Sequence, residues 1–138
     1  MLASTYLSEI EKLERAVKNK YAELADLRCL AESITAHIGT EPVQTSGVSD
    51  RVGGVTVRIV MKQDEILRMI DNFLDEKQKR IEIIELLEKP LEYDVLYQKY
   101  VKYMTLAEIA KEEKYSYQHI CDIHNKALEK IQIIINTL

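Results

Sequence analysis

Residues Thr105–Lys130, reading TLAEIAKEEKYSYQHICDIHNKALEK, predict two helices with a short break at Tyr115–Ser116. Apolar residues recur in both segments at helical spacing, so each helix has one face suited to burial. These inward residues are Leu106, Ile109 and Ala110 in the first helix, and Ile120, Ile123, Ala127 and Leu128 in the second. The spacing is that of a helix-turn-helix, in which the second helix can lie in the major groove of DNA.

The break is well suited to starting the second helix. Ser116 is a favourable N-cap, because its hydroxyl can accept a hydrogen bond from a free backbone N–H of the first turn. The reciprocal half of a capping box is missing, since position 119 is His rather than Glu or Gln. Ser116 therefore indicates where the second helix begins and which residues follow on its exposed face.

The exposed residues at the start of the second helix are the candidate base-reading groups. A glutamine can pair with adenine through two hydrogen bonds, and an aspartate can accept from the amino group of cytosine. We expect exposure, and with Ser116 a DNA-contacting surface, at Tyr117, Gln118, His119, Asp122, Asn125 and Lys126, and exposure also at Cys121. Lys111, Lys114 and Lys126 are candidate phosphate contacts, with an ordinary solvated lysine as the alternative interpretation of each.

The preceding part of the chain predicts two long helices. Apolar residues recur at spacings of three, four and seven over Tyr6–Ile38, and mainly at multiples of seven over Val57–Leu87. Gly39–Gly54, reading GTEPVQTSGVSDRVGG, is predicted to be a loop, because it holds five of the six glycines and prolines of the chain. It lacks the Gly-Lys-Ser/Thr of a phosphate-binding loop. The long helices would pair either as an antiparallel coiled-coil hairpin within the chain or between chains.

A third helix is predicted over Leu91–Met104, because Pro90 ends the second long helix and the apolar spacing resumes after it. The fold class is therefore all-α: a long N-terminal helical hairpin or coiled coil over residues 1–89, with the loop at 39–54, then a three-helix module over residues 90–138. Lys77 and Arg80 interrupt the apolar stripe of the second long helix, so the sequence leaves its register open. The closing residues are apolar almost all round and are predicted to be buried: Ile131, Ile133, Ile134, Ile135 and Leu138.

The charge distribution gives only weak support to a DNA-binding function. The net charge is −4, and residues 99–138 carry six Lys/Arg against five Asp/Glu. DNA-binding proteins draw much of their affinity from neutralising phosphates. A module this weakly basic would bind DNA as an oligomer that doubles its contacts, or beside a larger partner, or would not bind DNA at all.

The same residues resemble a known family. Thr105–Ala110, then Tyr115-Ser116, then Ile120, Ile123 and Ala127-Leu128 are similar to region 4 of sigma factors, the module that reads promoters. The similarity extends from Tyr93 onward. In that module, positions matching Tyr117, Gln118, His119 and Asp122 supply base and phosphate contacts. The family commonly has arginines there, whereas this chain has none after Arg80.

The whole chain resembles small phage-encoded transcriptional regulators of the RinA/ArpU type. The added matches are Pro42-Val43, Ser46, Asp50–Gly53 and His124 within the C-terminal pattern. The resemblance implies a cytoplasmic phage or prophage transcriptional regulator that acts as a sigma-like accessory factor or activator. Its partners would be double-stranded promoter or operator DNA and RNA polymerase, and the long helices would form a homo-oligomer.

Two other functions fit the same pattern. One is a helical interaction adaptor whose helix-turn-helix does not bind DNA, and the other is a small-terminase-like factor in phage DNA packaging. An enzyme is not expected, and neither are a cofactor, a metal site or a membrane span. His37, His119 and His124 are scattered, and the last two, five residues apart, do not share a helix face as an i, i+4 metal pair would.

Overall fold

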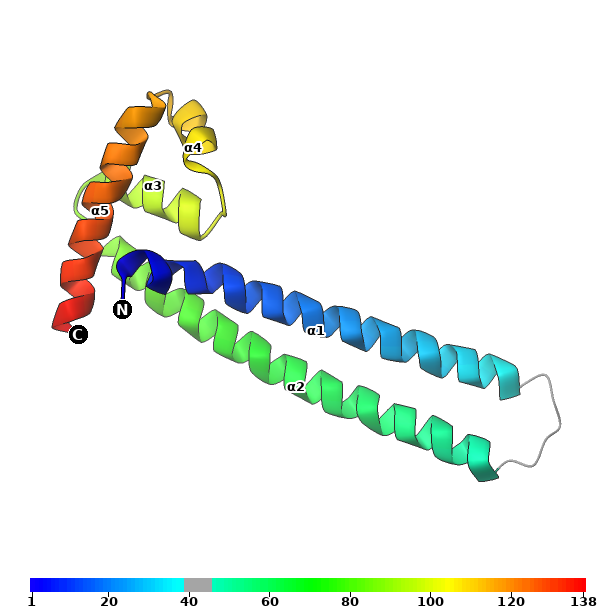
Figure 1. Cartoon of the computed structure of the whole chain (residues 1–138). Helices are drawn as coiled ribbons and strands as arrows, with labels where there is room; N and C mark the ends of the chain where they lie inside the picture. Colours follow the sequence, from blue (N-terminus) through cyan, green and yellow to red (C-terminus); the bar gives the residue numbers. More distant parts are fainter. Residues whose placement is uncertain (39–45) are drawn as a thin grey trace. The chain divides into compact units, whose positions relative to one another are not determined.

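The computed structural model describes the backbone of residues 1–38 and 46–138, and the side chains of residues 1–34 and 53–138. Within these ranges the chain is helical and has no strand, so the all-α prediction is confirmed for them. The helices, shown in Figure 1, are α1 (Ala3–Ile38), α2 (Ser46–Glu85), α3 (Pro90–Tyr100), α4 (Leu106–Glu113) and α5 (Tyr117–Thr137). None of them is long and apolar enough to cross a membrane, as far as the described residues show.

Helix α2 begins earlier than the sequence predicted. Ser46–Gly54 was expected to be loop, but its backbone is helical and continues into the rest of α2. The stretch holds three glycines, each of which costs about 1 kcal/mol in a helix relative to alanine, a cost that a helix of 40 residues tolerates. The remainder of the predicted loop, residues 39–45, with its Pro42-Val43 match, lies outside the described residues, as do the side chains of Ser46 and Asp50–Val52.

Helix α3 ends earlier than predicted. It starts at Pro90, whose fixed φ suits the first helical position, and stops at Tyr100 rather than at Met104. Tyr103 has φ 59°, a left-handed conformation that a right-handed helix cannot accommodate. The Met104 N–H donates to the Gln98 carbonyl at 3.0 Å, which closes the turn ahead of α4.

The residues form two compact units that interleave along the sequence. The hairpin unit comprises residues 15–72. The three-helix unit comprises residues 1–14 and 73–138, so it adds the first turns of α1 and the last turns of α2 to the three short helices. The domain boundary predicted at residue 89 lies inside this second unit.

In the hairpin unit, α1 and α2 pair antiparallel within the chain (Figure 1). Lys62 contacts Glu23 at 2.7 Å and Lys20 contacts Glu65 at 3.4 Å, which fixes the register of the two helices. The seam buries Val17, Leu24, Val55 and Ile66. Tyr21 follows the apolar spacing of α1, which predicts a place in this seam, but it is 50% exposed.

The core of the three-helix unit joins the ends of the long helices to α3 and α5. Its buried residues include Leu7, Ile84, Leu96 and Ile131. At the end of α5 the prediction of general burial is wrong for two residues: Ile133 is 65% and Leu138 is 84% exposed. Ile134 and Ile135 do pack against the core. The helix end contacts the core on one side only, so its other side stays in solvent.

Arg80, which interrupts the apolar stripe of α2, is itself buried in the core. It is 3% exposed, and its guanidinium lies over the Tyr6 ring at 4.2 Å. It donates to the Tyr6 carbonyl at 2.7 Å, to the Glu76 carboxylate at 2.6 Å and to the Glu9 carboxylate. A buried arginine with these acceptors around it therefore takes a core position and fixes the register of α1 against α2 in this unit.

Candidate functional site

The candidate site is the exposed face of α5, and the helices beneath it set its position. Val95 of α3, Ile109 and Ala110 of α4, and Ile120 of α5 form one buried cluster. Leu106 and Ile123, also predicted inward, are half-buried against it. Ala110 is small, which lets α4 and α5 approach closely. The apolar spacing thus leaves the opposite face of α5 toward solvent.

Side-chain caps define where α4 and α5 begin. The Ser116 hydroxyl accepts from the His119 N–H at 3.1 Å, as the sequence predicted. Thr105 caps α4 in the same way, accepting from the Glu108 N–H at 3.2 Å. The pattern Thr-x-x-Glu is a capping-box sequence, so the sequence also carries a signal for the start of α4. The two caps fix the direction in which each helix starts.

The turn between α4 and α5 depends on one left-handed residue. Lys114 has φ 61° and ψ 38°, and its N–H donates to the Ala110 carbonyl. The Tyr115 N–H donates to the same carbonyl at 3.0 Å. This is the usual way for a helix to end in a tight turn, but the left-handed position is normally glycine. The turn accordingly holds some backbone strain, and its lysine side chain is exposed to solvent.

The face of α5 presents six of the predicted residues together. They are exposed and belong to its first three turns: Tyr117, Gln118, His119, Asp122, Asn125 and Lys126. The Gln118 amide donates to the Asp122 carboxylate at 3.1 Å, so these two side chains form one polar pair. Cys121, also predicted exposed, is half-buried. Its thiol is hydrogen-bonded to Tyr117, which raises the pKa of the Tyr117 hydroxyl.

The candidate phosphate contacts are exposed as well. Lys111, Lys114 and Lys126 lie on α4, in the turn and on α5, and none of them makes an ion pair with another described residue. Glu108 and Glu112 are exposed on α4 and reduce the positive charge there. The site is therefore polar and only weakly basic.

Tyr115 is a candidate residue that the sequence interpretation treated only as a helix break. It is 48% exposed, and its ring lies 4.9 Å from the ring of His119, tilted by 44°. The pair forms an aromatic edge at the start of α5. The available signal was an aromatic residue directly before the Ser116 cap.

His124 belongs to the core rather than to the exposed face. It is 8% exposed, its Nε2 is 2.8 Å from the Tyr100 hydroxyl, and the two rings stack at 5.7 Å. Burial, together with the charge of nearby Lys99, lowers the pKa of His124, and burial raises the pKa of Tyr100 to about 12. The pair is thus neutral near pH 7 and links α3 to α5.

Four tyrosines recur every three or four residues in and just after α3, and they are largely packed. Tyr100 is buried, Tyr93 and Tyr97 are half-buried and stacked with centroids 5.7 Å apart, and Tyr103 beyond the helix is half-buried. This favours a packing role over a platform on which bases could stack. Among the described residues, no three His, Cys, Asp or Glu side chains gather as metal ligands.

Comparison with known proteins adds nothing to this geometry. No protein-family model, curated protein or solved structure matches the chain. A functional interpretation therefore rests on the residues and on how the fold arranges them.

Proposed function

We propose that the chain is a DNA-binding transcriptional regulator in which α4 and α5 act as a helix-turn-helix. One observation carries the proposal. A Ser-capped helix, held on a buried cluster, presents six polar or aromatic side chains on the exposed face of its first three turns. Recognition helices insert their N-terminal residues into the major groove in this way, while the preceding helix crosses the backbone.

Gln118 and Asp122 are the proposed base-reading residues. Their mutual hydrogen bond holds the glutamine amide in one orientation before DNA arrives, which lowers the conformational entropy lost on binding. The second Asp122 oxygen could then accept from a cytosine amino group. Ser116, Tyr117, His119 and Asn125 flank this pair, and Lys111, Lys114 and Lys126 would neutralise phosphates.

The weak positive charge suggests that binding is assisted. With six Lys/Arg against five Asp/Glu in residues 99–138, few counterions would be released. A homo-oligomer would double the phosphate contacts, and RNA polymerase would supply further affinity. As the RinA/ArpU and sigma region 4 resemblances imply, we propose a cytoplasmic phage or prophage accessory factor rather than an enzyme.

The proposal is tested by binding of purified variants to a selected site and to a scrambled one. Gln118→Ala should lose about 1–3 kcal/mol of discrimination at one base pair. Lys126→Ala should weaken all sequences alike and reduce the salt slope by about 1. Gln78→Ala is a matched control, because Gln78 donates to Glu82, four residues on, at 3.3 Å in an exposed pair. If Gln118→Ala and Gln78→Ala behave alike on both sites, the base-reading assignment is wrong.

One observation favours a second function, that of an interaction adaptor. The chain is acidic overall, and Asp122 places a negative charge on the proposed reading face. An adaptor would bind no duplex at near-physiological salt but would retain a protein partner. A packaging factor would instead form a ring-shaped oligomer. The mass of that oligomer would give its number of subunits.

A further inference from the structure

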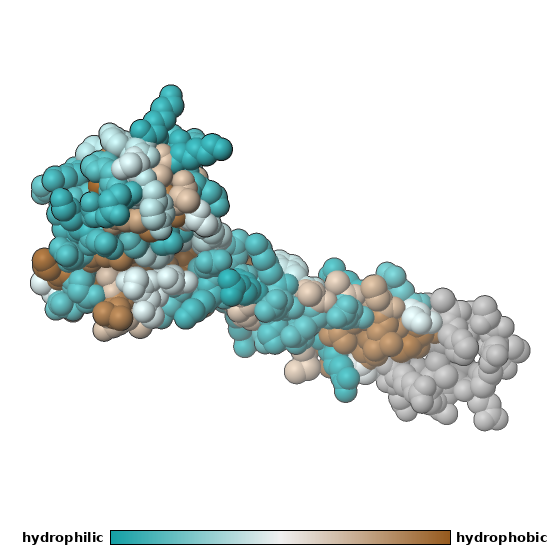
Figure 2. All heavy atoms as spheres, turned by 45° about the horizontal axis from the view of Figure 1, so that its top comes forward, coloured by the Kyte–Doolittle hydropathy of each residue, from teal (hydrophilic) through white to brown (hydrophobic). Residues whose placement is uncertain are grey.

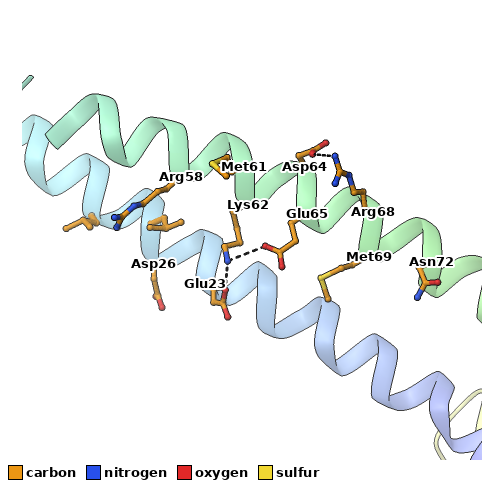
Figure 3. A pocket seen from close by; sticks show the side chains of 12 residues that line it. Glu23, Asp26, Arg58, Met61, Lys62, Asp64, Glu65, Arg68, Met69 and Asn72 are labelled. Carbon is orange, nitrogen blue, oxygen red and sulfur yellow. Dashed lines mark hydrogen bonds and ion pairs between the residues drawn. The ribbon is translucent and has the colours of Figure 1, made fainter. Parts of the chain in front are cut away.

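The hairpin unit has a groove between α1 and α2 with a volume of about 1060 Å³ (Figure 3). Its apolar lining consists of Leu27 and Leu30 from α1 and Met61 and Met69 from α2. The remaining lining residues are polar or charged. The groove lies on one flank of the seam, so it belongs to the hairpin alone.

Large apolar side chains are exposed at one end of this groove. Leu30 is 49% and Met61 is 66% exposed, and Val57 and Val60, which precede Met61 on α2 but do not line the groove, are 57% and 59% exposed. Figure 2 shows the corresponding hydrophobic surface on the hairpin unit, next to the grey residues. Single exposed apolar residues are ordinary, whereas a contiguous group indicates an interaction surface.

The seam of the hairpin is thin for its length. In residues 15–34 and 53–72 it buries four hydrophobic residues, namely Val17, Leu24, Val55 and Ile66. Most helical stability in proteins comes from packing of an apolar face. Two such hairpins packed together would form a four-helix bundle, in which each helix contacts two neighbours.

The charges that line the groove indicate which kind of partner fits it. The lining carries four acidic residues, Glu23, Asp26, Asp64 and Glu65, and three basic residues, Arg58, Lys62 and Arg68. A nucleic acid or a strongly charged protein would require an excess of one sign. A nearly balanced face is complementary to itself, as the contact across a two-fold axis requires.

Most of these charges are already paired within the hairpin. Lys62 contacts Glu23 at 2.7 Å and Arg68 contacts Asp64 at 2.8 Å. Asp26 and Arg58, which lie at the apolar end, make no ion pair with another described residue. The pairing of residue 23 with 62 and of 20 with 65 puts residues 26 and 58 at nearly the same level of the hairpin.

We propose that this groove binds the same groove of a second copy of the chain. The two hairpins form a four-helix bundle about a two-fold axis parallel to the helices, with Leu30 and Met61 of both copies at its centre. In this arrangement α1 of one copy lies beside α2 of the other at equal height. Arg58 of each copy then meets Asp26 of the other. The interface does not depend on whether the chain binds DNA.

Sedimentation equilibrium of the full-length protein, without DNA, tests the interface. The wild type should be a dimer. Met61→Lys places a charge in both halves of the contact and should raise the dimer dissociation constant by at least about 100-fold. Ile133→Lys is the matched control, since Ile133 is 65% exposed on α5. It should leave the dimer intact. A monomeric wild type, or a dimer unaffected by Met61→Lys, overturns the proposal.

A charge-swap experiment tests the pairing itself and does not rely on disrupting the apolar contact. Arg58→Glu alone and Asp26→Arg alone each put like charges across the axis twice, so each variant should dimerise more weakly than the wild type.

Mixing the two variants should restore a one-to-one heterodimer. The glutamate introduced in one variant then meets the arginine introduced in the other, and the unchanged Asp26 of the first meets the unchanged Arg58 of the second. Circular dichroism of each variant serves as the control that the chain stays helical. If the mixture associates no better than the separate variants, the proposed alignment is wrong.

Discussion

Replacing Arg80 should destabilise the three-helix unit more than any change to a surface lysine. Arg80 is 3% exposed and contacts Tyr6, Glu9 and Glu76. Arg80→Ala would leave both carboxylates without their buried cation and the Tyr6 carbonyl without a donor. It would also open a cavity beneath the Tyr6 ring.

The structure sets the magnitude of this effect. Breaking a buried charge pair by removing one partner costs about 3–5 kcal/mol. Glu9 and Glu76 are 32% and 29% exposed, so water can partly solvate them once the arginine is gone. We therefore expect the lower end, about 3 kcal/mol of unfolding free energy. Lys79→Ala is the matched control, because Lys79 contacts the same Glu76 at 3.3 Å but is 64% exposed. It should cost about 0–1 kcal/mol.

Urea unfolding followed by circular dichroism measures both variants. The Arg80 hydrogen bond, followed by that of Lys79, lowers the pKa of Glu76 below its ordinary value of 4.5. A lowered folded-state pKa contributes stability above the unfolded pKa, and this stability is lost as the pH falls through the folded value. The pH dependence below about 4.5 should therefore be shallower in Arg80→Ala than in the wild type. Equal losses from Arg80→Ala and Lys79→Ala would mean that buried Arg80 contributes no more stability than an exposed lysine.

Three further predictions concern the helices. Gly53→Ala and Gly54→Ala should each stabilise the protein by about 0.5–1 kcal/mol in thermal unfolding, because both are helical and a Cβ would meet nothing within 4 Å; a loss would mean that the start of α2 is not helical. Lys114→Gly should raise the free energy of unfolding by about 0.5 kcal/mol by removing left-handed strain, whereas Lys111→Gly, inside α4, should lower it by about 1 kcal/mol. Urea midpoints that shift in the same direction in both variants would contradict this. His124→Gln should reduce the loss of stability on acidification. The lowered pKa of His124 makes the folded state bind fewer protons than the unfolded state once the pH falls below about 6.5. An unchanged slope of the unfolding free energy against pH between pH 7 and pH 5 would exclude this.

The C-terminal helices could be predicted from the sequence because local signals agreed there. Ser116 capped α5 where the apolar spacing restarted, and Ile109, Ala110 and Ile120 met in one cluster. Exposure of the candidate residues followed from the same spacing. The half-buried state of Cys121 did not follow from that spacing.

The features that the sequence left open depend on tertiary contacts. Arg80 interrupts an apolar stripe, and only the positions of Tyr6, Glu9 and Glu76 make it a core residue. The helical start of α2 contradicted the composition of Ser46–Gly54, because glycine content weighs against a helix only by small increments. Ile133 matched a buried pattern, but the core reaches only one side of its helix.

Selection from a random duplex library, with the purified protein alone at near-physiological salt, is the direct test of sequence-specific DNA binding by α5. We expect one enriched motif that is lost when Gln118 and Asp122 are both replaced by alanine and kept in Gln78→Ala. The half-site spacing of the motif would also report the geometry of a dimer. No enrichment by the wild type would contradict DNA reading by α5 and would favour the adaptor.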